Sequence, residues 1–102
     1  MRFVLIGHDG PNGVELRKVH REAHLKRLEE LDSRKKLILA GPFADWTGSL
    51  VVFEAESLEE ARRWAEKDPY IQKKVFSHYE VKSFTQVFPR PIEAPPKSAN
   101  IE

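Results

Sequence analysis

The segment LILAGPFADWTGSLVVF, residues 37–53, holds two short apolar runs in direct succession. The first run ends at Gly41-Pro42 and the second opens after Gly48, with a loop that contains Asp45 between them. Periodicity alone would also allow a buried helix, but the brevity of the runs and their Gly and Pro boundaries favour strands. We therefore predict two consecutive strands in the middle of the chain.

The chain on the N-terminal side of this segment predicts a strand followed by a helix. Phe3 to Ile6 form a short apolar run that stops at Gly7, as expected of a buried strand that enters a loop. Between residues 16 and 32 the apolar residues recur at steps of three to five, without Gly or Pro. This spacing predicts an amphipathic helix whose apolar stripe comprises Leu16, Val19, Ala23, Leu28 and Leu31.

Two helices are predicted on the C-terminal side. Ser57 and Glu60 have the spacing of a capping box, which places the start of a helix at Ser57. Asp68-Pro69 ends this helix because the residue before proline is pushed out of the α region, and the same pair can start a short helix with Asp68 as its N-cap. The apolar residues expected in the short helix are Tyr70, Ile71, Val75 and Phe76.

The order of the elements indicates the fold class. Alternating side chains from Tyr79 onward predict a fourth strand that runs to Val87 or Phe88. The result is an α+β chain with the order of a ferredoxin-like βαββαβ sandwich, an antiparallel sheet with both long helices on one face and an extra short helix before the last strand. Residues 1–88 form the predicted domain. Residues 89–102, which hold four of the seven prolines, form a predicted extended tail.

Length, charge and composition narrow the classes of protein that this chain can be. The 102 residues are enough for one domain, and a net charge of +1 offers no concentrated positive field for nucleic acid. With no cysteine, the chain has no disulfide, thiolate nucleophile or Cys-ligated metal, which fits a reducing cytoplasm. No apolar run approaches the ~20 residues of a membrane span. We expect a cytoplasmic protein without nucleic-acid or membrane partners.

A second copy of the chain is the expected protein partner. A domain of this size buries only about 60–65% of the surface of its unfolded chain. The predicted sheet also holds more apolar residues than two helices can cover, among them Phe3, Leu5, Leu39, Leu50, Val52 and Phe53. We therefore predict a homodimer in which the partner covers the side of the sheet that the helices leave open.

The four histidines are the side chains best suited to proton transfer near neutral pH. His20 and His24 are four residues apart, on one side of the predicted helix and close to its apolar stripe. This spacing resembles a two-histidine metal pair, but Arg21-Glu22-Ala23 does not give the H-E-x-x-H order and no third ligand is evident. We therefore predict no metal site. For each histidine, a solvated surface position is the simple alternative.

Motifs spread over most of the chain resemble those of one known family. The matching pieces, in order, are Arg21-Glu22-Ala23-His24-Leu25, Leu39-Ala40-Gly41-Pro42, Gly48-Ser49, Ser57-Leu58-Glu59-Glu60-Ala61, Trp64-Ala65, Asp68-Pro69-Tyr70 and Val81-Lys82-Ser83-Phe84. Each piece is common, but together and in this order they resemble the YciI-like, or YCII-related, family over about residues 1–88. The tail has no counterpart in this resemblance.

The resemblance implies a ferredoxin-like dimeric protein, related to the dimeric α/β-barrel proteins, with a pocket centred on a histidine and an aspartate. Motif positions place this pair at His24 and Asp68, although an aspartate before proline is also a routine helix cap. The sequence departs from the family at Lys74, where a glycine is usual, and in a short connection between Pro42 and Gly48. One characterised branch of the family eliminates chloride from a chlorinated hydroxyhydroquinone. The residues to which the resemblance assigns substrate-binding positions are Arg21, Gly41, Pro42, Ser49 and Tyr70.

Two functions from different classes are compatible with these residues. The first is an enzyme without a cofactor, a lyase, isomerase or hydrolase in which His24 acts as acid and base on a small phenolic, enolic or lactone substrate. Asp68 would fix the imidazole tautomer by accepting a hydrogen bond from it, and Arg21 would attract an anionic group. Ser49 lacks the G-x-S-x-G context of a nucleophile, so it is assigned a hydrogen-bonding role. The alternative is a non-catalytic dimeric module that binds a ligand or assists another protein.

Overall fold

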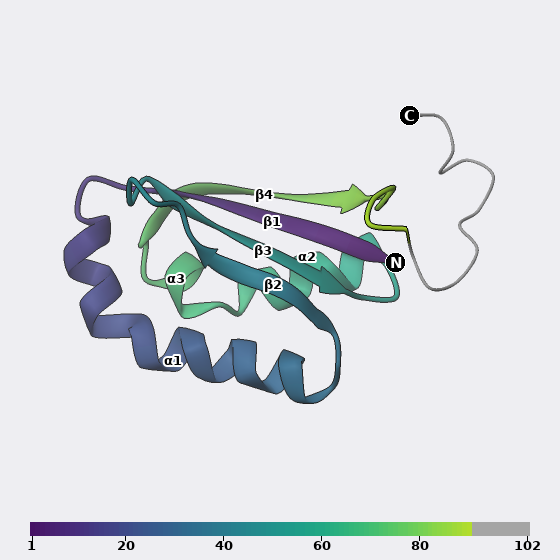
Figure 1. The fold of residues 1–102 in the computed structure, drawn as a ribbon. Coiled ribbons are helices and arrows are strands. Elements are labelled where there is room, and N and C mark those ends of the chain that lie inside the picture. The colour runs from purple at the N-terminus through teal and green to yellow at the C-terminus, as the bar shows by residue number, and fades with distance from the viewer. Residues whose placement is uncertain (91–102) are drawn as a thin grey trace.

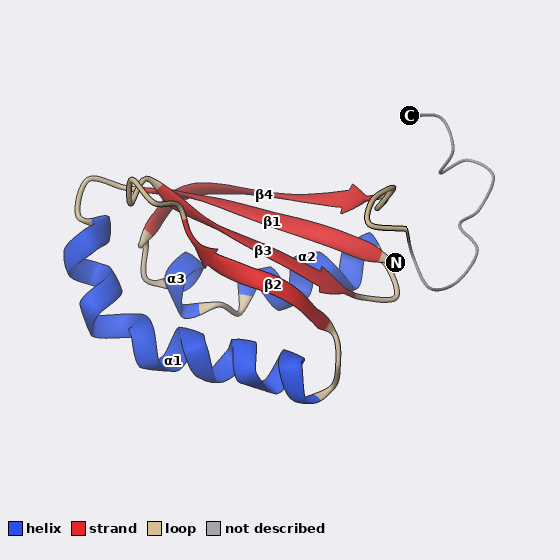
Figure 2. Ribbon diagram, viewed as in Figure 1, coloured by secondary structure: helices blue, strands red, loops and turns tan. Residues whose placement is uncertain are grey.

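The computed structural model describes residues 1–90, so most of the predicted tail, residues 89–102, lies outside the described residues. Its elements are β1 (Arg2–Asp9), α1 (Gly13–Ser33), β2 (Leu37–Pro42), β3 (Gly48–Glu54), α2 (Leu58–Glu66), α3 (Pro69–Gln72) and β4 (Phe76–Phe84). The four strands form one antiparallel sheet in the order β2-β3-β1-β4 (Figure 1). All three helices lie on one face of this sheet (Figure 2). The predicted α+β, ferredoxin-like fold is confirmed. Among residues 1–90, no helix has the length and apolar character needed to cross a membrane.

The sheet has two different faces because side chains alternate along each strand. On β1, Phe3 and Leu5 are buried toward the helices, whereas Val4 and Ile6 point to the opposite side and are half-buried. The side chains of β3 alternate between buried and half-buried in the same way. We call the side of the sheet away from the helices its open face.

The hydrophobic core fills the layer between the sheet and the helices. It consists of Phe3, Leu5, Leu28, Leu31, Val51, Phe53, Ala55, Ala61 and Ala65. Ala61 and Ala65 are completely buried, so α2 packs closely on the sheet through its smallest side chains. A second, smaller cluster of Tyr70, Val75 and Phe76 lies beside α3.

The long helix α1 differs from its prediction in its start and in its buried side. It begins at Gly13 rather than near residue 16. Its buried residues are Gly13, Arg17, His24, Leu28 and Leu31. Val19, assigned to the apolar stripe, is 73% exposed, and Ala23 is exposed as well. The predicted stripe is wrong at these two positions because the helix buries Arg17, whose charge is paired with Asp9, in place of Val19.

The N-terminal caps of the two shorter helices form as predicted. At the start of α2, Ser57 Oγ accepts a hydrogen bond from the Glu60 N–H at 3.1 Å. At the start of α3, Asp68 has an extended backbone and accepts a hydrogen bond in its carboxylate, and Pro69 is the first helical residue. Both helices therefore begin where the sequence signals place them.

β4 begins earlier than predicted. The short helix α3 ends at Gln72, so Val75 and Phe76 do not belong to it. Phe76 is instead the first residue of β4. Its ring packs against Gly7 of β1, where an added Cβ atom would collide with the ring. Because Gly7 has no side chain, Phe76 can pack closely against β1, and β4 therefore begins at this residue.

β4 also ends earlier than predicted. The strand stops at Phe84 instead of reaching Val87 or Phe88. Within the sheet, Phe84 pairs with Arg2, which is the first residue of β1. Beyond this pair, the Met1 carbonyl accepts a hydrogen bond from the Ala55 N–H, next to β3, so the ladder between β1 and β4 ends here.

Candidate active site

His24 and Asp68 lie side by side in the layer between the sheet and the helices. His24 is in the middle of α1 and is 7% exposed, and Asp68, the cap of α3, is completely buried. The His24 Nδ1 atom lies 2.9 Å from Oδ1 and 3.1 Å from Oδ2 of Asp68. The fold thus joins two residues that are 44 positions apart into one hydrogen-bonded pair.

The carboxylate of Asp68 is held by two further contacts. The Tyr70 N–H donates a hydrogen bond to Oδ1 at 2.9 Å, and Arg27 Nη1 lies 3.3 Å from Oδ2. Because an ionised carboxylate can only accept hydrogen bonds, we assign the shared proton to Nδ1 of His24. Nε2 is then the nitrogen with a free lone pair, and no group within residues 1–90 hydrogen-bonds to it. This is the arrangement of an oriented general base.

The aromatic ring of Tyr70 stacks on the imidazole of His24. The ring centroids are 3.9 Å apart and the planes are inclined by 8°. Burial raises the pKa of the Tyr70 phenol, although the positive charges of Arg17 and Arg21 act in the opposite direction. Tyr70 is therefore a neutral hydroxyl at physiological pH and forms one wall beside His24.

A second buried ion pair, which sequence analysis did not identify, lies next to Tyr70. Arg17 donates hydrogen bonds from Nε and Nη2 to the two carboxylate oxygens of Asp9, both at 2.8 Å. Its Nη2 also donates to Ser49 Oγ at 2.8 Å. The hydrogen bond with Asp9 raises the pKa of Arg17 against the opposing effect of burial. The guanidinium carbon is 5.2 Å from the centre of the Tyr70 ring, so a fixed positive charge lies beside the wall that covers His24.

Both members of this ion pair have a signal in the sequence. Alternation along β1 places Asp9 on the same side as Phe3 and Leu5. Arg17 precedes His24 by seven residues, about two helical turns, and therefore lies on the same side of α1. Gly13, at the start of α1, leaves room for the pair, because a Cβ atom there would collide with the Asp9 carboxylate. The pattern that identifies this ion pair is a charged residue at a core-facing position in each of two neighbouring elements.

Arg27 connects the His24–Asp68 pair to α2. Besides its contact with Asp68, it donates a hydrogen bond from Nη2 to the Trp64 carbonyl at 2.7 Å. Its guanidinium carbon lies 4.3 Å from the centre of the Trp64 ring, a cation–π contact. Burial lowers the pKa of Arg27, against the effect of the Asp68 charge. Sequence analysis did not select this residue, although it follows His24 by about one turn of the helix.

The structure brings several of the residues assigned by sequence into contact. His24, Asp68 and Tyr70 form one contiguous group, and Ser49 is joined to it through Arg17. Arg21 is exposed on α1, but it is close enough for its charge to act on the Tyr70 phenol. These positions describe a buried centre with cationic surroundings.

Gly41 and Pro42 lie apart from that group, on the edge strand β2. Both are exposed, and Pro42 pairs with Ser49 across the β2–β3 ladder. At Gly41, no atom of the described residues other than its chain neighbours lies within 4 Å of where a Cβ atom would be. These two residues border the site only from the side of Ser49.

The residues around His24 can perform proton transfer. Residues 1–90 contain no group of three or more His, Cys, Asp or Glu side chains arranged to hold a metal ion. His20, the other member of the spacing noted in the sequence, is half-buried, and it hydrogen-bonds to no described residue. An imidazole held by a buried carboxylate, with one guanidinium beside Tyr70 and another beside Asp68, favours acid and base chemistry on an anionic or acidic molecule.

Comparison with known proteins identifies relatives along most of the chain. The family model described as the YCII-related domain matches residues 1–85. Protein YciI of Escherichia coli is 40% identical over 98 residues, which covers 86% of this chain and 100% of that protein. An uncharacterized protein of Haemophilus influenzae is 38% identical over the same shares of the two chains.

A solved structure is similar in both fold and sequence. It is 5-chloro-2-hydroxyhydroquinone dehydrochlorinase from Burkholderia phenoliruptrix, in complex with 2,5-dihydroxybenzoquinone. The two structures superimpose with a TM-score of 0.74 at 30% identity, over 82% of this chain and 93% of the other. The likeness therefore extends over nearly the whole of that enzyme.

Proposed function

The chain belongs to the YCII-related family, and on this basis we propose that it is a small-molecule enzyme that transfers protons through the His24–Asp68 pair without a cofactor. The observation that supports this proposal most directly is the buried hydrogen bond of 2.9 Å between the imidazole and the carboxylate. It leaves one ring nitrogen free to accept a proton from a bound molecule. The substrate class is a small phenol, enol or lactone, and the reaction is an elimination, an isomerisation or a hydrolysis.

The residues around His24 have distinct roles in such a reaction. Nε2 accepts the proton of an acidic hydroxyl or C–H group, and the imidazolium that forms is stabilised by Asp68. In an elimination, the electron pair left on the substrate forms a new double bond while the leaving group departs with the electrons of its own bond. The exposed charge of Arg21, which also acts on the Tyr70 phenol, favours the anion that develops.

The similar dehydrochlorinase supports this choice of substrate class. That enzyme is named for the removal of hydrogen chloride from a hydroxylated ring, and it binds a dihydroxybenzoquinone. Loss of hydrogen chloride requires one proton acceptor and the departure of one anion, which an imidazole and the nearby cation of Arg21 can assist. We therefore place hydroxylated, ring-shaped and acidic molecules first among the candidate substrates.

A substrate screen with matched histidine variants tests the proposed function. Halogenated hydroxyhydroquinones, hydroxyquinones and small lactones are supplied to the wild type, His24→Ala, Asp68→Asn and His20→Ala, and product formation is followed by absorbance or chromatography. Loss of the general base in His24→Ala lowers kcat by about 10²- to 10⁴-fold. Asp68→Asn also lowers kcat, because an amide does not orient the tautomer or stabilise the imidazolium as a carboxylate does.

His20→Ala is the matched control, since it removes an imidazole one turn earlier on the same helix. We expect its kcat to equal that of the wild type. Full activity in a folded His24→Ala variant would refute the role of His24. Absence of turnover, together with a melting temperature that rises on addition of one of these molecules, would instead support a non-catalytic ligand-binding module.

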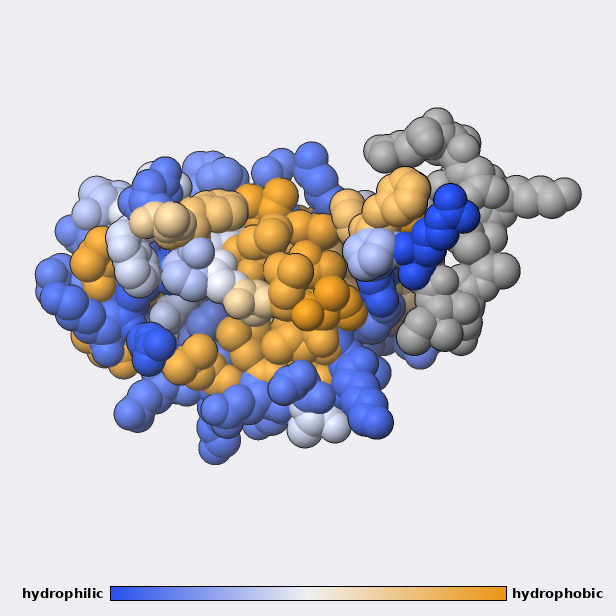
Figure 3. Space-filling model, viewed as in Figure 1, coloured by the Kyte–Doolittle hydropathy of each residue, from blue (hydrophilic) through white to orange (hydrophobic). Residues whose placement is uncertain are grey.

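We also propose that the active form is a homodimer in which the partner subunit covers the open face of the sheet. Alternation and strand pairing put Val4, Ile6, Leu39, Leu50, Val52 and Phe84 on this face. Leu39 is 51% exposed and Phe84 is 47% exposed. Figure 3 shows apolar residues gathered over the middle of the molecule around β2.

Sedimentation at micromolar concentration should show that the wild type is a dimer, and Leu39→Glu should shift the equilibrium toward the monomer. A monomeric wild type would contradict the proposal.

A further inference from the structure

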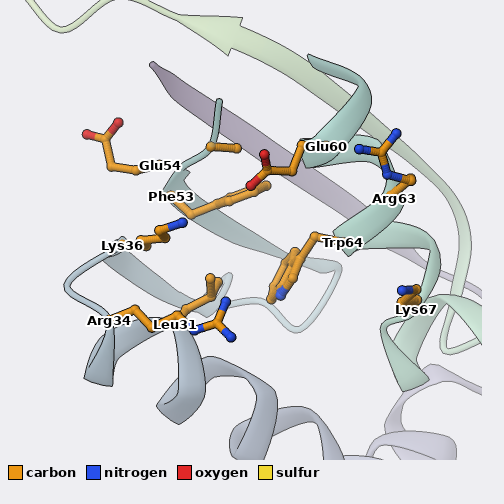
Figure 4. A pocket seen from close by; sticks show the side chains of 10 residues that line it. Leu31, Arg34, Lys36, Phe53, Glu54, Glu60, Arg63, Trp64 and Lys67 are labelled. Carbon is orange, nitrogen blue, oxygen red and sulfur yellow. The ribbon is translucent and has the colours of Figure 1, made fainter. Parts of the chain in front are cut away.

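A hollow of about 210 Å³ lies between α1, α2 and the end of β3. Its charged lining residues are Arg34, Lys36, Glu54, Glu60, Arg63 and Lys67. None of these residues belongs to the group around His24. Trp64 lies within the hollow close to Phe53, and Arg34 and Lys36 extend toward it from the α1–β2 connection (Figure 4). The centroids of the Trp64 and Phe53 rings are 4.9 Å apart, so the floor of the hollow is aromatic.

The walls of the hollow carry more positive than negative charge. Four cationic side chains and two carboxylates line it. One of the carboxylates, Glu54, is already paired with Arg2 at 2.7 Å and with the N-terminal ammonium at 3.3 Å. The C-terminal ends of α1 and α2 add only about half a negative charge each. The hollow therefore keeps an excess of positive charge above an aromatic floor.

We propose that this hollow is a binding site for a small organic anion with a flat apolar part, and that its occupancy is transmitted to the His24–Asp68 pair. An aromatic floor favours a planar ring, and exposed guanidinium and ammonium groups favour a carboxylate, sulfonate or phosphate. The volume of about 210 Å³ is below the range of about 300–1,000 Å³ that is usual for drug-sized ligands, so the ligand has one or two rings.

The connection to His24 consists of contacts between successive side chains. Trp64 lines the hollow, whereas Arg27 does not, and the guanidinium of Arg27 lies over the Trp64 ring at 4.3 Å. Arg27 also forms an ion pair with Asp68, which is hydrogen-bonded to His24. A ligand that moves the Trp64 ring therefore displaces Arg27, and the position of Arg27 affects the carboxylate that orients the imidazole. This part of the inference concerns the same pair as the proposed function, but binding in the hollow does not depend on catalysis.

Titration of the full chain with 2-naphthoate, followed by NMR, tests the proposal. The two tryptophan indole N–H signals report on different places, since Trp64 lines the hollow and Trp46 lies 6.0 Å from Arg17. We expect the Trp64 signal to shift on titration, the Trp46 signal to stay, and the ring resonances of His24 to shift with the same apparent Kd. Higher ionic strength should weaken the binding because the cationic groups are exposed to screening.

Variants assign the binding to the hollow. The double variant Arg34→Ala with Lys36→Ala should weaken 2-naphthoate binding about five- to tenfold. Arg62→Ala is the matched control, because Arg62 is an exposed cation on α2 that does not line the hollow. Unchanged affinity in the double variant, equally tight binding of the neutral 2-naphthylmethanol, or a dominant shift of Trp46 would overturn the site.

The transmission to His24 is tested separately. Arg27→Gln should keep the affinity for 2-naphthoate within about twofold while the shift of the His24 resonances is lost. If this variant is unstable, Arg27→Lys retains the charge and lacks the flat contact with Trp64, and it should show the same loss. Binding that shifts Trp64 but leaves the His24 resonances unmoved in the wild type would overturn the transmission, whatever the outcome of the substrate screen.

Discussion

The layer between the sheet and the helices is filled differently at its two ends. The apolar end is built from Phe3, Leu28, Leu31, Phe53, Ala61 and Ala65. The polar end consists of Asp9, Arg17, His24, Ser49, Asp68 and Tyr70. It contains all four of the buried polar or charged residues within residues 1–90, namely Arg17, His24, Ser49 and Asp68. The helix α1 crosses from one to the other, since its buried side changes from Arg17 and His24 to Leu28 and Leu31.

The difference shows what each end contributes. Apolar burial at the apolar end stabilises the fold by about 25 cal/mol per Å² removed from water. At the polar end, burial of charge is unfavourable unless each charge is paired, and here Arg17 is paired with Asp9 and Asp68 with Arg27 and His24. The comparison thus distinguishes residues that stabilise the fold by apolar burial from residues whose charges are buried only as pairs.

The largest effect on stability is expected at the apolar end. Phe3 is completely buried, and Phe3→Ala would leave a cavity that neighbouring side chains can fill only in part. The substitution should lower the free energy of unfolding by about 3–5 kcal/mol, measured by urea denaturation. Val19→Ala, at a position that is 73% exposed, is the control. Its effect should stay within about 0.5 kcal/mol. A cost below about 1 kcal/mol for Phe3→Ala would contradict the assignment of this end to stability.

The ion pair at the polar end gives the next largest effect. Asp9→Asn removes the carboxylate from Arg17, whose side chain is 8% exposed, and leaves its charge buried without a counter-ion. The free energy of unfolding should fall by about 3 kcal/mol, and Asp9→Asn combined with Arg17→Met should recover part of the loss. Glu15→Gln is the control, because it breaks the exposed pair with Lys18 and should cost less than about 0.5 kcal/mol. Equal losses in Asp9→Asn and Glu15→Gln would mean that the buried pair stabilises the fold no more than the exposed pair does.

The elements of the fold could be predicted because their signals are local. Short apolar runs bounded by Gly and Pro, a capping box at Ser57 and an Asp-Pro cap at Asp68 are all visible within a few residues. The end of β4 could not be predicted in this way. It depends on where β1 begins, since Phe84 pairs with Arg2 across the sheet. Strand ends set by a distant partner are not encoded in the strand itself.

The polar end was only partly accessible to sequence reasoning. A family motif indicates His24 and Asp68. Asp9 and Arg17 occupy core-facing positions of β1 and α1, but a search for apolar periodicity passes over a charged residue at such a position. Their burial follows from contacts between β1 and α1, which a stripe of apolar residues does not describe. The same search for apolar periodicity places Val19 in the stripe, whereas in the structure Arg17 is buried and Val19 is exposed.

Tyr70 offers the smallest of the three effects and tests whether the polar end is closed to solvent. Burial raises its pKa above the ordinary value of 10.0, against the opposing charges of Arg17 and Arg21. The folded chain therefore binds the phenolic proton more tightly than the unfolded chain, and the resulting stability is present below pH 10 and is lost as the pH rises from 10 through the folded pKa. Tyr70→Phe has no phenol to ionise and therefore lacks this loss of stability at high pH.

The free energy of unfolding of the wild type relative to Tyr70→Phe should thus fall above about pH 10, as measured by urea denaturation at each pH. Tyr79→Phe is the control, since the chain has two tyrosines. Parallel pH curves for the wild type and Tyr70→Phe would mean that the phenol is as well solvated in the fold as in the unfolded chain, and the polar end would then be open to water around His24.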